Sequence, residues 1–296
     1  MRFRFFVLLA LSFSATALAQ ATLQERIAAI AADARGKVSV SCSLAGAEIL
    51  CDLNPHAHPP MQSVFKFPLA LAALHIVEQG ELSLDQPIRF RASDRILPQT
   101  YSPLQDKYPA AEVDVSLREL LRLVVSLSDN TAADIVLRTI GGPKPVDDYV
   151  QALGIGGFHL EDGERALHRD VAAQYRNWCE PAAAVRLLRR LCDNSPLNDE
   201  HTRLLLGGME DSPARTQRIR GRLPAGTRVM HKSGTSSTGG GLTPATNDIG
   251  LIVMPDGRRL AVAVFVTDST ADDATRDLVI ARIARAAYDA AVASGK

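Results

Sequence analysis

The sequence predicts an α+β protein in which strands from both ends of the chain form one antiparallel sheet with flanking helices, beside an inserted all-helical lobe. Two observations lead to this prediction. β-Branched runs gather at residues 37–53 and 227–267, whereas helix-type apolar spacing dominates from residue 63 to residue 209. Separated runs of strands and helices are typical of α+β folds rather than of alternating α/β folds. The chain is long enough to bury such a core, with 296 residues of which 46% are hydrophobic.

The first 19 residues have the pattern of a secretory signal peptide. Arg2 and Arg4 give a basic start, an apolar run covers residues 5–13, and Ala17-Leu18-Ala19 forms a small-x-small cleavage site. The apolar run is too short to span a bilayer. We therefore expect cleavage after Ala19, export to the periplasm, and a mature protein that is not attached to the membrane.

The next expected element is a hairpin of two strands, residues 37–44 and 48–53. Gly46-Ala47 between them suits a two-residue turn. That register places Cys42 directly opposite Cys51, at a separation that a disulfide can bridge. An oxidising compartment outside the cytoplasm is consistent with this pairing.

The other two cysteines are harder to join. Cys179 and Cys192 flank a predicted helix, and thirteen helical residues at about 1.5 Å each would separate them by roughly 20 Å. They could form a disulfide only if the helix begins late, so their state stays open at this point.

The rest of the chain reads as a series of amphipathic helices followed by strands and a final helix. Ser116-Leu-Arg-Glu119 is a capping box at the start of one helix, and Gly141 follows the end of the next. Pro255-Asp-Gly257 marks a turn between two strands. The expected strands of this part are residues 227–231, 248–254 and 260–267, and the expected helices are residues 63–79, 116–127, 131–140, 145–153, 181–191, 198–209 and 272–292.

These elements predict two lobes. Residues 20–58 and 212–296 would form the lobe that contains the sheet, and residues 59–211 would form the all-helical lobe. Because clefts tend to form where two such units meet, the interface between the lobes is the expected place for an active site.

The charge balance argues against one class of function. Lysine plus arginine and aspartate plus glutamate each number 33, so the formal net charge is zero at pH 7. Nucleic-acid binding depends on a concentrated basic face, and no nucleic-acid partner is therefore expected. His56 and His58 flank prolines in a connection, which favours a surface loop over a zinc site. We expect a monomer that acts on a small molecule and needs neither metal nor cofactor.

Three short motifs carry the chemistry, and the first opens a predicted helix. Ser63-Val-Phe-Lys66 places a hydroxyl and an amine three residues apart, on one face of that helix. Serine is a weak nucleophile that needs an adjacent base, and Lys66 can serve when burial or neighbouring cations keep it partly neutral. The helix N-terminus at Ser63 also stabilises negative charge.

The second and third motifs lie in the helical lobe and near the C-terminus. Ser128-Asp129-Asn130 joins two predicted helices, where the same residue types are also common helix caps. Lys232-Ser233-Gly234-Thr235 ends a predicted strand, where the glycine would let a substrate backbone approach closely. Each motif alone is weak evidence, whereas the three in this order are specific.

Together, Ser-x-x-Lys, Ser-Asp-Asn and Lys-Ser-Gly form the signature of active-site serine penicillin-recognising enzymes. A fourth motif, Glu164-Arg-Ala-Leu-His168, lies where class A enzymes carry Glu-x-x-Leu-Asn. The chain therefore resembles a class A serine β-lactamase over essentially its whole mature length. In that family the glutamate activates the water that hydrolyses the acyl-enzyme, and penicillin-binding transpeptidases lack it. The alternative for Glu164 is a solvated charge beside Glu161 and Asp162.

The resemblance implies a catalytic role for five residues. Ser63 attacks the lactam carbonyl, and the main-chain N–H groups of Ser63 and Thr235 form the oxyanion hole. Lys66, or Glu164 through a water molecule, takes the proton of the serine. Ser128 passes a proton to the lactam nitrogen as the ring opens.

Other residues would bind the substrate. Arg218 is implied less specifically than the rest, because Arg215, Arg220 and Arg222 are close to it in the sequence. The implied substrate-binding residues are Lys232, Ser233 and Thr235 for the carboxylate, Asn130 for the acylamino side chain, Tyr101 for the aromatic wall of the cleft, His168 beside the hydrolytic water, and Arg218 as an additional carboxylate ligand.

The chain departs from the common class A pattern at two positions. His168 and Asp134 stand where asparagines are usual. Two carboxylates in contact would raise one pKa strongly, so we expect Asp134 and Glu164 not to touch and their loop to fold differently from that of the commonest enzymes. Both replacements, with Gly239-Gly-Gly241 lengthening the edge of the late strand, resemble an extended-spectrum branch of class A with a wider pocket.

The resemblance implies hydrolysis of the β-lactam ring of penicillins and cephalosporins, oxyimino-cephalosporins included, through a serine acyl-enzyme that confers antibiotic resistance. Two alternatives use the same first three motifs. A DD-peptidase or transpeptidase would act on peptidoglycan with Glu164 incidental, and a non-catalytic β-lactam sensor domain would acylate once and stop. Deacylation through Glu164 separates the first function from both.

Overall fold

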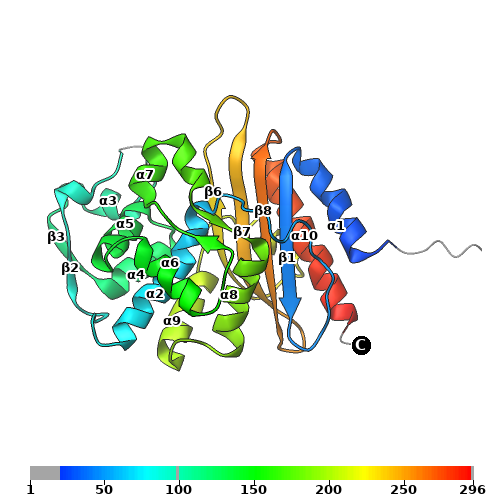
Figure 1. Cartoon of the computed structure of the whole chain (residues 1–296), viewed down its shortest axis with the longest axis horizontal. Coiled ribbons are helices and arrows are strands. Elements are labelled where there is room, and N and C mark those ends of the chain that lie inside the picture. Colours follow the sequence, from blue (N-terminus) through cyan, green and yellow to red (C-terminus); the bar gives the residue numbers. More distant parts are fainter. Residues whose placement is uncertain (1–20, 98–99, 295–296) are drawn as a thin grey trace, which may run out of the picture.

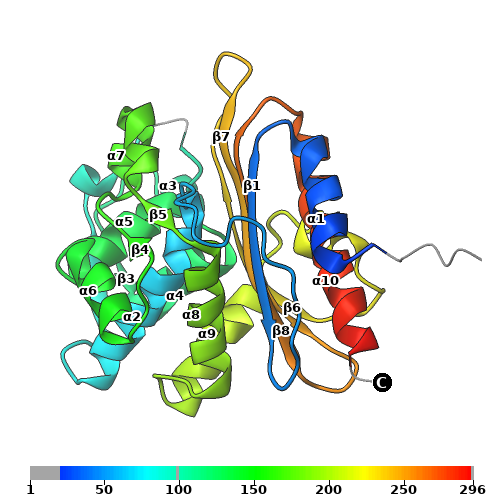
Figure 2. The same cartoon turned by 45° about the vertical axis from the view of Figure 1, so that its right-hand side comes forward.

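A four-stranded antiparallel sheet stands between two helical layers (Figure 1). The computed structural model describes residues 21–97 and 100–294, so the predicted signal peptide lies outside the described residues. Two long helices cover one face of the sheet, and the other long helices gather against the opposite face, as the turned view also shows (Figure 2). The α+β fold class predicted from the sequence is confirmed.

The sheet brings both ends of the chain together. Its strand order is β1-β8-β7-β6, so the first strand pairs with the last one, with Lys37 opposite Thr267. Each neighbouring pair is antiparallel. The strands are β1 (Lys37–Leu44), β6 (Val229–Thr235), β7 (Thr243–Val253) and β8 (Arg259–Ser269).

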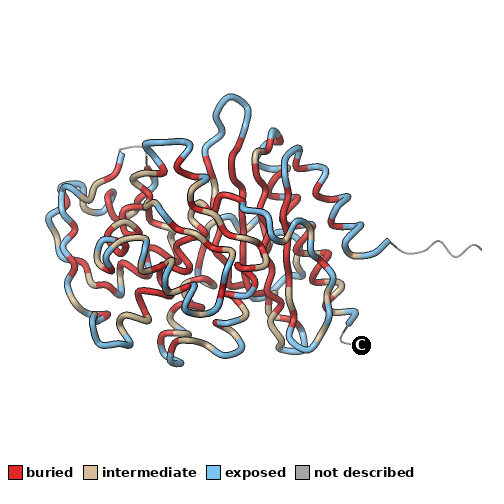
Figure 3. Tube along the Cα trace, in the orientation of Figure 1, coloured by how far each residue is buried: buried red, intermediate tan, exposed pale blue. Residues whose placement is uncertain are grey.

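Alternate residues of the sheet face two separate cores. Val40 and Val264, with their even-numbered neighbours on β1 and β8, pack toward α1 (Leu23–Ala31) and α10 (Asp273–Ala293). Phe265 and its odd-numbered neighbours belong to the core that the sheet shares with the helical lobe. Figure 3 shows the resulting concentration of buried residues along the strands. Because a slip of one residue would exchange the two faces, this pattern specifies the register.

The helical lobe covers the other face of the sheet. Its central helix, α2, is buried continuously from Lys66 to Leu74. The short pairs β2–β3 and β4–β5 form two small antiparallel sheets. The elements of this part are η2 (Gln62–Phe65), α2 (Lys66–Glu78), β2 (Pro87–Phe90), η3 (Ala92–Asp94), α3 (Pro103–Lys107), β3 (Val113–Ser116), α4 (Leu117–Ser126), α5 (Asn130–Thr139), α6 (Lys144–Ala152), β4 (Phe158–His159), α7 (Glu164–Arg169), η4 (Val171–Tyr175), β5 (Trp178–Cys179), α8 (Pro181–Asp193) and α9 (Asp199–Glu210).

Helix α1 is absent from the sequence-based prediction, although its start carries a recognisable signal. Thr22 Oγ1 accepts a hydrogen bond from the Glu25 N–H, and the Glu25 carboxylate accepts one from the Thr22 N–H. This is a complete capping box. Only Ile27, Ile30 and Ala31 of the helix are buried, so its apolar face is narrow and gives a weak periodic signal.

The turn of the first hairpin lies one residue earlier than predicted. The Ala47 N–H donates to Leu44 O, which leaves Ala45 and Gly46 as the loop. Gly46 has a φ of 71°, a conformation that glycine adopts without steric penalty, and this explains why it takes the second loop position. Residues 48–52 do not form the predicted strand, because the chain pairs back onto β1 only at Leu53, opposite Val40.

The predicted disulfide between Cys42 and Cys51 is present despite this irregular return, with Cα atoms 6.0 Å apart. Cys179 and Cys192 are free thiols. Helix α8 begins at Pro181, two residues after Cys179, so the helix does not start late enough to bring the two sulfur atoms together.

Replacing both Cys42 and Cys51 by alanine is expected to lower the free energy of unfolding by about 2–3 kcal/mol, because the disulfide closes a short loop in the unfolded chain. Urea unfolding of the variant and the wild type measures the difference. The matched control is the Cys179→Ala/Cys192→Ala variant, which keeps the disulfide. An unfolding midpoint that neither the first substitution nor a reductant changes would contradict the expectation.

The division into two lobes stays a prediction. We propose residues 59–211 as one lobe and residues 20–58 with 212–296 as the other, since the helices of the former stand on one side of the sheet (Figure 1). Within residues 21–97 and 100–294, no helix combines the length and the apolar character needed to cross a bilayer.

Candidate active site

The turn that precedes α2 places Ser63 at the end of the sheet. Ser63 belongs to η2 (Gln62–Phe65), and Gln62 adopts a positive φ of 48°, which is disfavoured for residues with a side chain. Asn247 on β7 donates hydrogen bonds of 2.8 and 3.1 Å to the main-chain oxygens of residues 60 and 61. The segment before Ser63 is therefore held in an unusual conformation by the sheet, as is common at functional sites.

Lys66 lies at the centre of the site with its side chain fully buried. Its Nζ atom lies 3.0 Å from Ser63 Oγ and 2.8 Å from Glu164 Oε1. The ammonium also donates to the main-chain oxygen of Ser128, at 2.8 Å, and to Asn130 Oδ1. An ammonium has three hydrogens, so all of them have acceptors here, and the buried charge is compensated by a carboxylate.

Glu164 begins α7 and is only 2% exposed. Ser63 Oγ donates to Glu164 Oε1 over 3.4 Å, so the carboxylate is within reach of both the serine hydroxyl and Lys66. One turn later, His168 Nδ1 lies 2.8 Å from the main-chain oxygen of Glu164 and 3.7 Å from its Oε2. Because a carbonyl oxygen can only accept, Nδ1 carries a hydrogen, which leaves Nε2 for another partner.

A second buried lysine faces Ser128. Lys232 Nζ donates to Ser128 Oγ at 2.8 Å, and Lys232 is only 2% exposed. Burial, followed by the charge of Lys66, holds the pKa of Lys232 well below its ordinary value. Ser128 itself has a positive φ of 58°, so a second serine of the site lies on strained backbone.

Asp129, the middle residue of its motif, has a structural role. It is fully buried and caps α5, where its carboxylate accepts a 2.8 Å hydrogen bond from the Ala132 N–H. Ser102 Oγ and the Leu104 N–H also donate to this carboxylate, at 2.8 and 2.6 Å. The capping function that such residue types usually have therefore applies to Asp129, and it keeps Ser128 and Asn130 in place on either side.

Gly234 allows β6 to approach the segment before Ser63. A Cβ atom at Gly234 would lie 2.4 Å from Met61 O and 3.2 Å from Ser63 N. The close approach is therefore to the protein's own backbone, and this corrects the expectation that the glycine makes room for the substrate. The third motif also lies inside β6 rather than at the end of a strand that stops at residue 231.

Arg218 lies next to Thr235, is only 1% exposed and is not among the residues that line the cavity beside Ser63. Its Nη2 atom donates to Thr235 Oγ1 at 2.9 Å, and its Nε atom donates to Asp277 Oδ1 at 2.7 Å. Burial lowers the pKa of Arg218, against the opposing effect of the Asp277 charge. Arg218 is thus placed to orient the hydroxyl of Thr235.

Tyr101 and Ser233 lie near the site without facing its cavity. Tyr101 is 58% exposed, and its main-chain oxygen accepts a hydrogen bond from the Asn130 N–H at 3.4 Å. Ser233 is buried on β6, and its main-chain oxygen accepts a 3.0 Å hydrogen bond from Lys232 Nζ.

A cavity of about 430 Å³ opens beside the serine hydroxyl. One wall is formed by the connection from β6 to β7, including Gly239 and Leu242, and another by η4. We call it the Ser63 cavity. The predicted site residues that line it are Ser63, Asn130, Glu164, His168 and Thr235.

Three side chains that the sequence motifs do not reveal join the walls of the Ser63 cavity. Gln62 Nε2 donates to Ser236 Oγ at 2.9 Å and to Gln174 Oε1. Ser236 Oγ donates to the same Gln174 oxygen at 2.6 Å. Gln62 directly precedes Ser63, and Ser236 directly follows Thr235. Their positions next to the motifs were the only sequence signal that could have predicted a place in the cavity wall.

Asp134 contacts Glu164 through the main chain, and the expectation that the two residues do not touch is wrong. Its Oδ1 accepts the Glu164 N–H at 2.7 Å and its Oδ2 accepts the Arg165 N–H at 2.9 Å. Gly163 makes room, since a Cβ there would lie 2.5 Å from Asp134 Oδ1. Burial, followed by the charge of Glu164, raises the pKa of Asp134 to about 6, and the two N–H groups partly oppose this rise.

The contribution of Asp134 to the free energy of unfolding is expected to fall as the pH rises from below 3.8 to above about 6. In that window the native carboxyl binds its proton more tightly than the unfolded chain does, and a pKa difference of about two units corresponds to roughly 3 kcal/mol. Urea unfolding of the wild type and of Asp134→Asn across this range tests the sign. A difference between the two proteins that does not change with pH would contradict the expectation.

Comparison with known proteins agrees with this geometry. The model of the β-lactamase enzyme family matches residues 22–291. The extended-spectrum β-lactamase PER-1 of Pseudomonas aeruginosa is 38% identical over 285 residues, which cover 95% of this chain and 92% of that protein. A β-lactamase of Bacteroides uniformis is 42% identical over 243 residues, or 80% of each chain.

Solved structures show the same relationship. The crystal structure of a β-lactamase from Chitinophaga pinensis has a TM-score of 0.87 and 41% identity, covering 91% of this chain and 99% of that one. The crystal structure of the TLA-1 extended-spectrum β-lactamase has a TM-score of 0.88 and 37% identity, covering 91% of this chain and 98% of that one. The chain therefore belongs to the β-lactamase enzyme family, as a class A serine enzyme of the branch that contains extended-spectrum members.

Proposed function

We propose that this β-lactamase opens the lactam ring of penicillins and cephalosporins, oxyimino-cephalosporins included, through an acyl-enzyme on Ser63. The observation that carries the proposal is the position of Lys66 Nζ, which contacts Ser63 Oγ at 3.0 Å and Glu164 Oε1 at 2.8 Å. A nucleophile with a buried lysine on one side and a buried carboxylate on the other has the groups needed both to form and to hydrolyse an ester.

In the acylation step, Ser63 Oγ bonds to the lactam carbonyl carbon and the carbon–nitrogen bond of the ring breaks. The proton of the serine goes to the Glu164 carboxylate through a water molecule, or to the Lys66 amine once the Lys66 ammonium has passed its own proton to Glu164, since both groups lie within reach of Oγ. The main-chain N–H groups of Ser63 and Thr235 would stabilise the carbonyl oxygen as it becomes negative.

The leaving nitrogen needs a proton, and Ser128 is placed to deliver it. Its hydroxyl accepts a hydrogen bond from Lys232 Nζ at 2.8 Å. Lys232 can therefore stabilise the negative charge that builds on Ser128 Oγ while the hydroxyl hydrogen moves to the lactam nitrogen.

The same lysine would attract the carboxylate that β-lactams carry next to the ring nitrogen. Thr235 would donate its hydroxyl to that carboxylate, because Arg218 Nη2 already occupies an acceptor position on Oγ1. Asn130 and Ser233, with Tyr101 at the edge, complete the proposed contacts to the rest of the substrate.

In the deacylation step, Glu164 would take a proton from a water molecule that attacks the ester carbonyl, the bond from the carbonyl carbon to Ser63 Oγ would break, and Oγ would receive a proton from Lys66 or Glu164. His168 Nε2 is free to bind that water, because Nδ1 is occupied by the Glu164 main chain. A peptidase or a sensor domain stays acylated, and the burial of Glu164 beside Ser63 favours the hydrolase over both alternatives.

We further propose export to the periplasm after cleavage behind Ala19, and action as a monomer. The N-terminal sequence pattern supports the first statement. The second is supported by the site itself, since one chain supplies every group named in the proposed mechanism.

Steady-state hydrolysis of benzylpenicillin and of cefotaxime, an oxyimino-cephalosporin, tests the proposal. We expect multiple turnovers of both, with a transient acyl-enzyme visible by intact mass. The connection of β6 to β7, which is exposed and turns at Gly240-Gly241, would leave room for bulky substrate side chains. Fast turnover of the penicillin without detectable turnover of cefotaxime would refute the wider spectrum, and a stable adduct with both would refute hydrolysis.

A further inference from the structure

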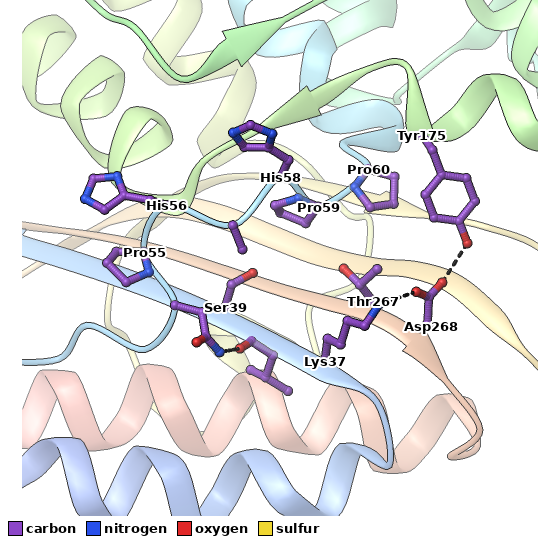
Figure 4. A pocket seen from close by; sticks show the side chains of 13 residues that line it. Lys37, Ser39, Pro55, His56, His58, Pro59, Pro60, Tyr175, Thr267 and Asp268 are labelled. Atoms are coloured by element: carbon purple, nitrogen blue, oxygen red, sulfur yellow. Dashed lines mark hydrogen bonds and ion pairs between the residues drawn. The ribbon is translucent and has the colours of Figure 1, made fainter.

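A second cavity, of about 670 Å³, lies between the 55–60 segment and the part of the sheet where the beginning of β1 pairs with the end of β8 (Figure 4). We call it the β1–β8 trough. Its floor is formed by Ser39 and Thr267, and its walls by prolines of the 55–60 segment and by Tyr175. Tyr175 also lines the Ser63 cavity, so the two cavities share one side chain as a wall.

The floor of the trough carries two hydroxyls, and the buried hydroxyl of Thr267 lacks a partner. Ser39 on β1 is 4% exposed and Thr267 on β8 is 8% exposed. Thr267 Oγ1 is a buried atom without a hydrogen-bond partner among the described residues. Figure 4 shows both side chains rising from the strands toward the 55–60 segment. Because a buried hydroxyl without a partner is unfavourable, the Thr267 hydroxyl is best explained by a group that the trough binds beside Ser39.

The charged side chains around the trough are already paired. Lys37 Nζ lies 3.2 Å from Asp268 Oδ2, and Tyr175 OH donates to Asp268 Oδ1 at 2.6 Å. On the opposite side, His56 Nδ1 lies 2.8 Å from Glu180 Oε2. A charged ligand would therefore have to break an existing ion pair, whereas an uncharged ligand would not.

The walls supply apolar surface. Pro55, Pro59 and Pro60 present ring carbons, and Tyr175 presents an aromatic ring at one end (Figure 4). A hydroxyl can donate and accept, so the floor matches a ligand with hydroxyl groups of its own. A pyranose ring has both properties, since its C–H face can lie on prolines and an aromatic ring while its hydroxyls reach Ser39 and Thr267.

We propose that the β1–β8 trough is a binding site for an uncharged saccharide, held by hydrogen bonds to the Ser39 and Thr267 hydroxyls. The site is separate from Ser63, and the proposal stands whether or not the proposed substrate spectrum is correct.

The protein contains a built-in reporter for this site. Trp178 is the single tryptophan of the chain, and it stacks on His58 with ring centroids 3.7 Å apart. His58 belongs to the wall of the trough, so a ligand that moves the 55–60 segment changes the surroundings of Trp178. Titration with methyl β-D-glucopyranoside should change tryptophan fluorescence with saturation at about millimolar concentration. Saturation-transfer NMR of the sugar provides a second readout that does not depend on the tryptophan.

Three substitutions test the floor. Ser39→Ala and Thr267→Val should each weaken binding about three- to tenfold, because each removes one hydrogen bond. Ser43→Ala is the matched control, since Ser43 lies on the same face of β1 but does not line the trough, and it should leave binding unchanged. Without sugar, Thr267→Val should melt at the same or a higher temperature than the wild type, because the buried hydroxyl has no partner to lose.

The outcomes separate clearly. Saturable binding that the two floor variants weaken and Ser43→Ala preserves would support the site. No binding by either readout, or equal binding by all variants, would overturn it. Tighter binding of D-glucuronate than of the glucoside would also overturn the proposal, because it would identify a site for anions. A large loss of thermal stability in Thr267→Val would show that the hydroxyl has a structural partner.

Discussion

Glu164→Ala is expected to convert the enzyme into one that is acylated once and then stays acylated. Glu164 is the buried carboxylate nearest to Ser63 Oγ, and no other acidic side chain lines the Ser63 cavity in the described part of the chain. Removal of a general base slows a reaction by about 10²- to 10⁴-fold. Mixing the variant with a chromogenic cephalosporin should give a single burst of colour and an intact mass increased by one acyl group.

The wild type is the control, and it should show continuous turnover with its unmodified mass restored when the substrate is consumed. Glu164→Gln keeps the size of the side chain and should behave like the alanine variant. If the Glu164→Ala variant hydrolysed the cephalosporin at the wild-type rate, Glu164 would serve only as the ion-pair partner of Lys66. If it failed to acylate at all, Glu164 would be essential for the first step.

Ser63→Ala should abolish covalent chemistry, with a fall in kcat/KM of about 10⁴-fold or more. The substitution removes the attacking atom but leaves Lys66 paired with Glu164 at 2.8 Å, so the fold should remain intact. The variant should still bind benzylpenicillin, because Lys232 and Thr235 do not depend on Ser63 Oγ. Calorimetry measures that binding, and intact mass shows whether an adduct forms.

Ser236→Ala is the matched control for Ser63→Ala. It removes a hydroxyl that lines the same cavity and bonds Gln174, not Lys66. Its effect on acylation should be small by comparison. An adduct on Ser63→Ala, or a loss in Ser236→Ala as large as in Ser63→Ala, would show that the nucleophile has been misidentified.

The sequence predicted the part of the active site that is formed by residues close together in the chain. Ser63 and Lys66 are three residues apart, so one turn of helix is enough to bring their side chains together, and the structure places them at 3.0 Å. The order of the motifs then indicated the family. The sheet could be predicted because β-branched residues alternate between two buried faces.

The errors have physical causes that a single sequence does not display. Charge repulsion between Asp134 and Glu164 was the correct effect to consider, since it helps to raise the pKa of Asp134 to about 6, but the sequence does not show the two N–H groups at the start of α7 that bind the Asp134 carboxylate. For Arg218, the sequence shows a cation near β6 but not its hydrogen-bond partners, and its role as a carboxylate ligand stays a prediction. Arg218 donates to Thr235 Oγ1 and to the main-chain oxygen of Gly234, and Thr235 itself lines the Ser63 cavity.

The pairing of β1 with β8 also determines when a newly made chain can become active. Lys37 meets Thr267, near opposite ends of the sequence, and contacts between such distant residues form late because the chain must first close a long loop. A chain that ends before β8 already contains Ser63, Lys66 and Glu164, but β1 has no strand to pair with and β7 has an open edge. We therefore expect truncated chains to be both inactive and prone to aggregation, so that hydrolysis of an antibiotic reports complete synthesis of the protein.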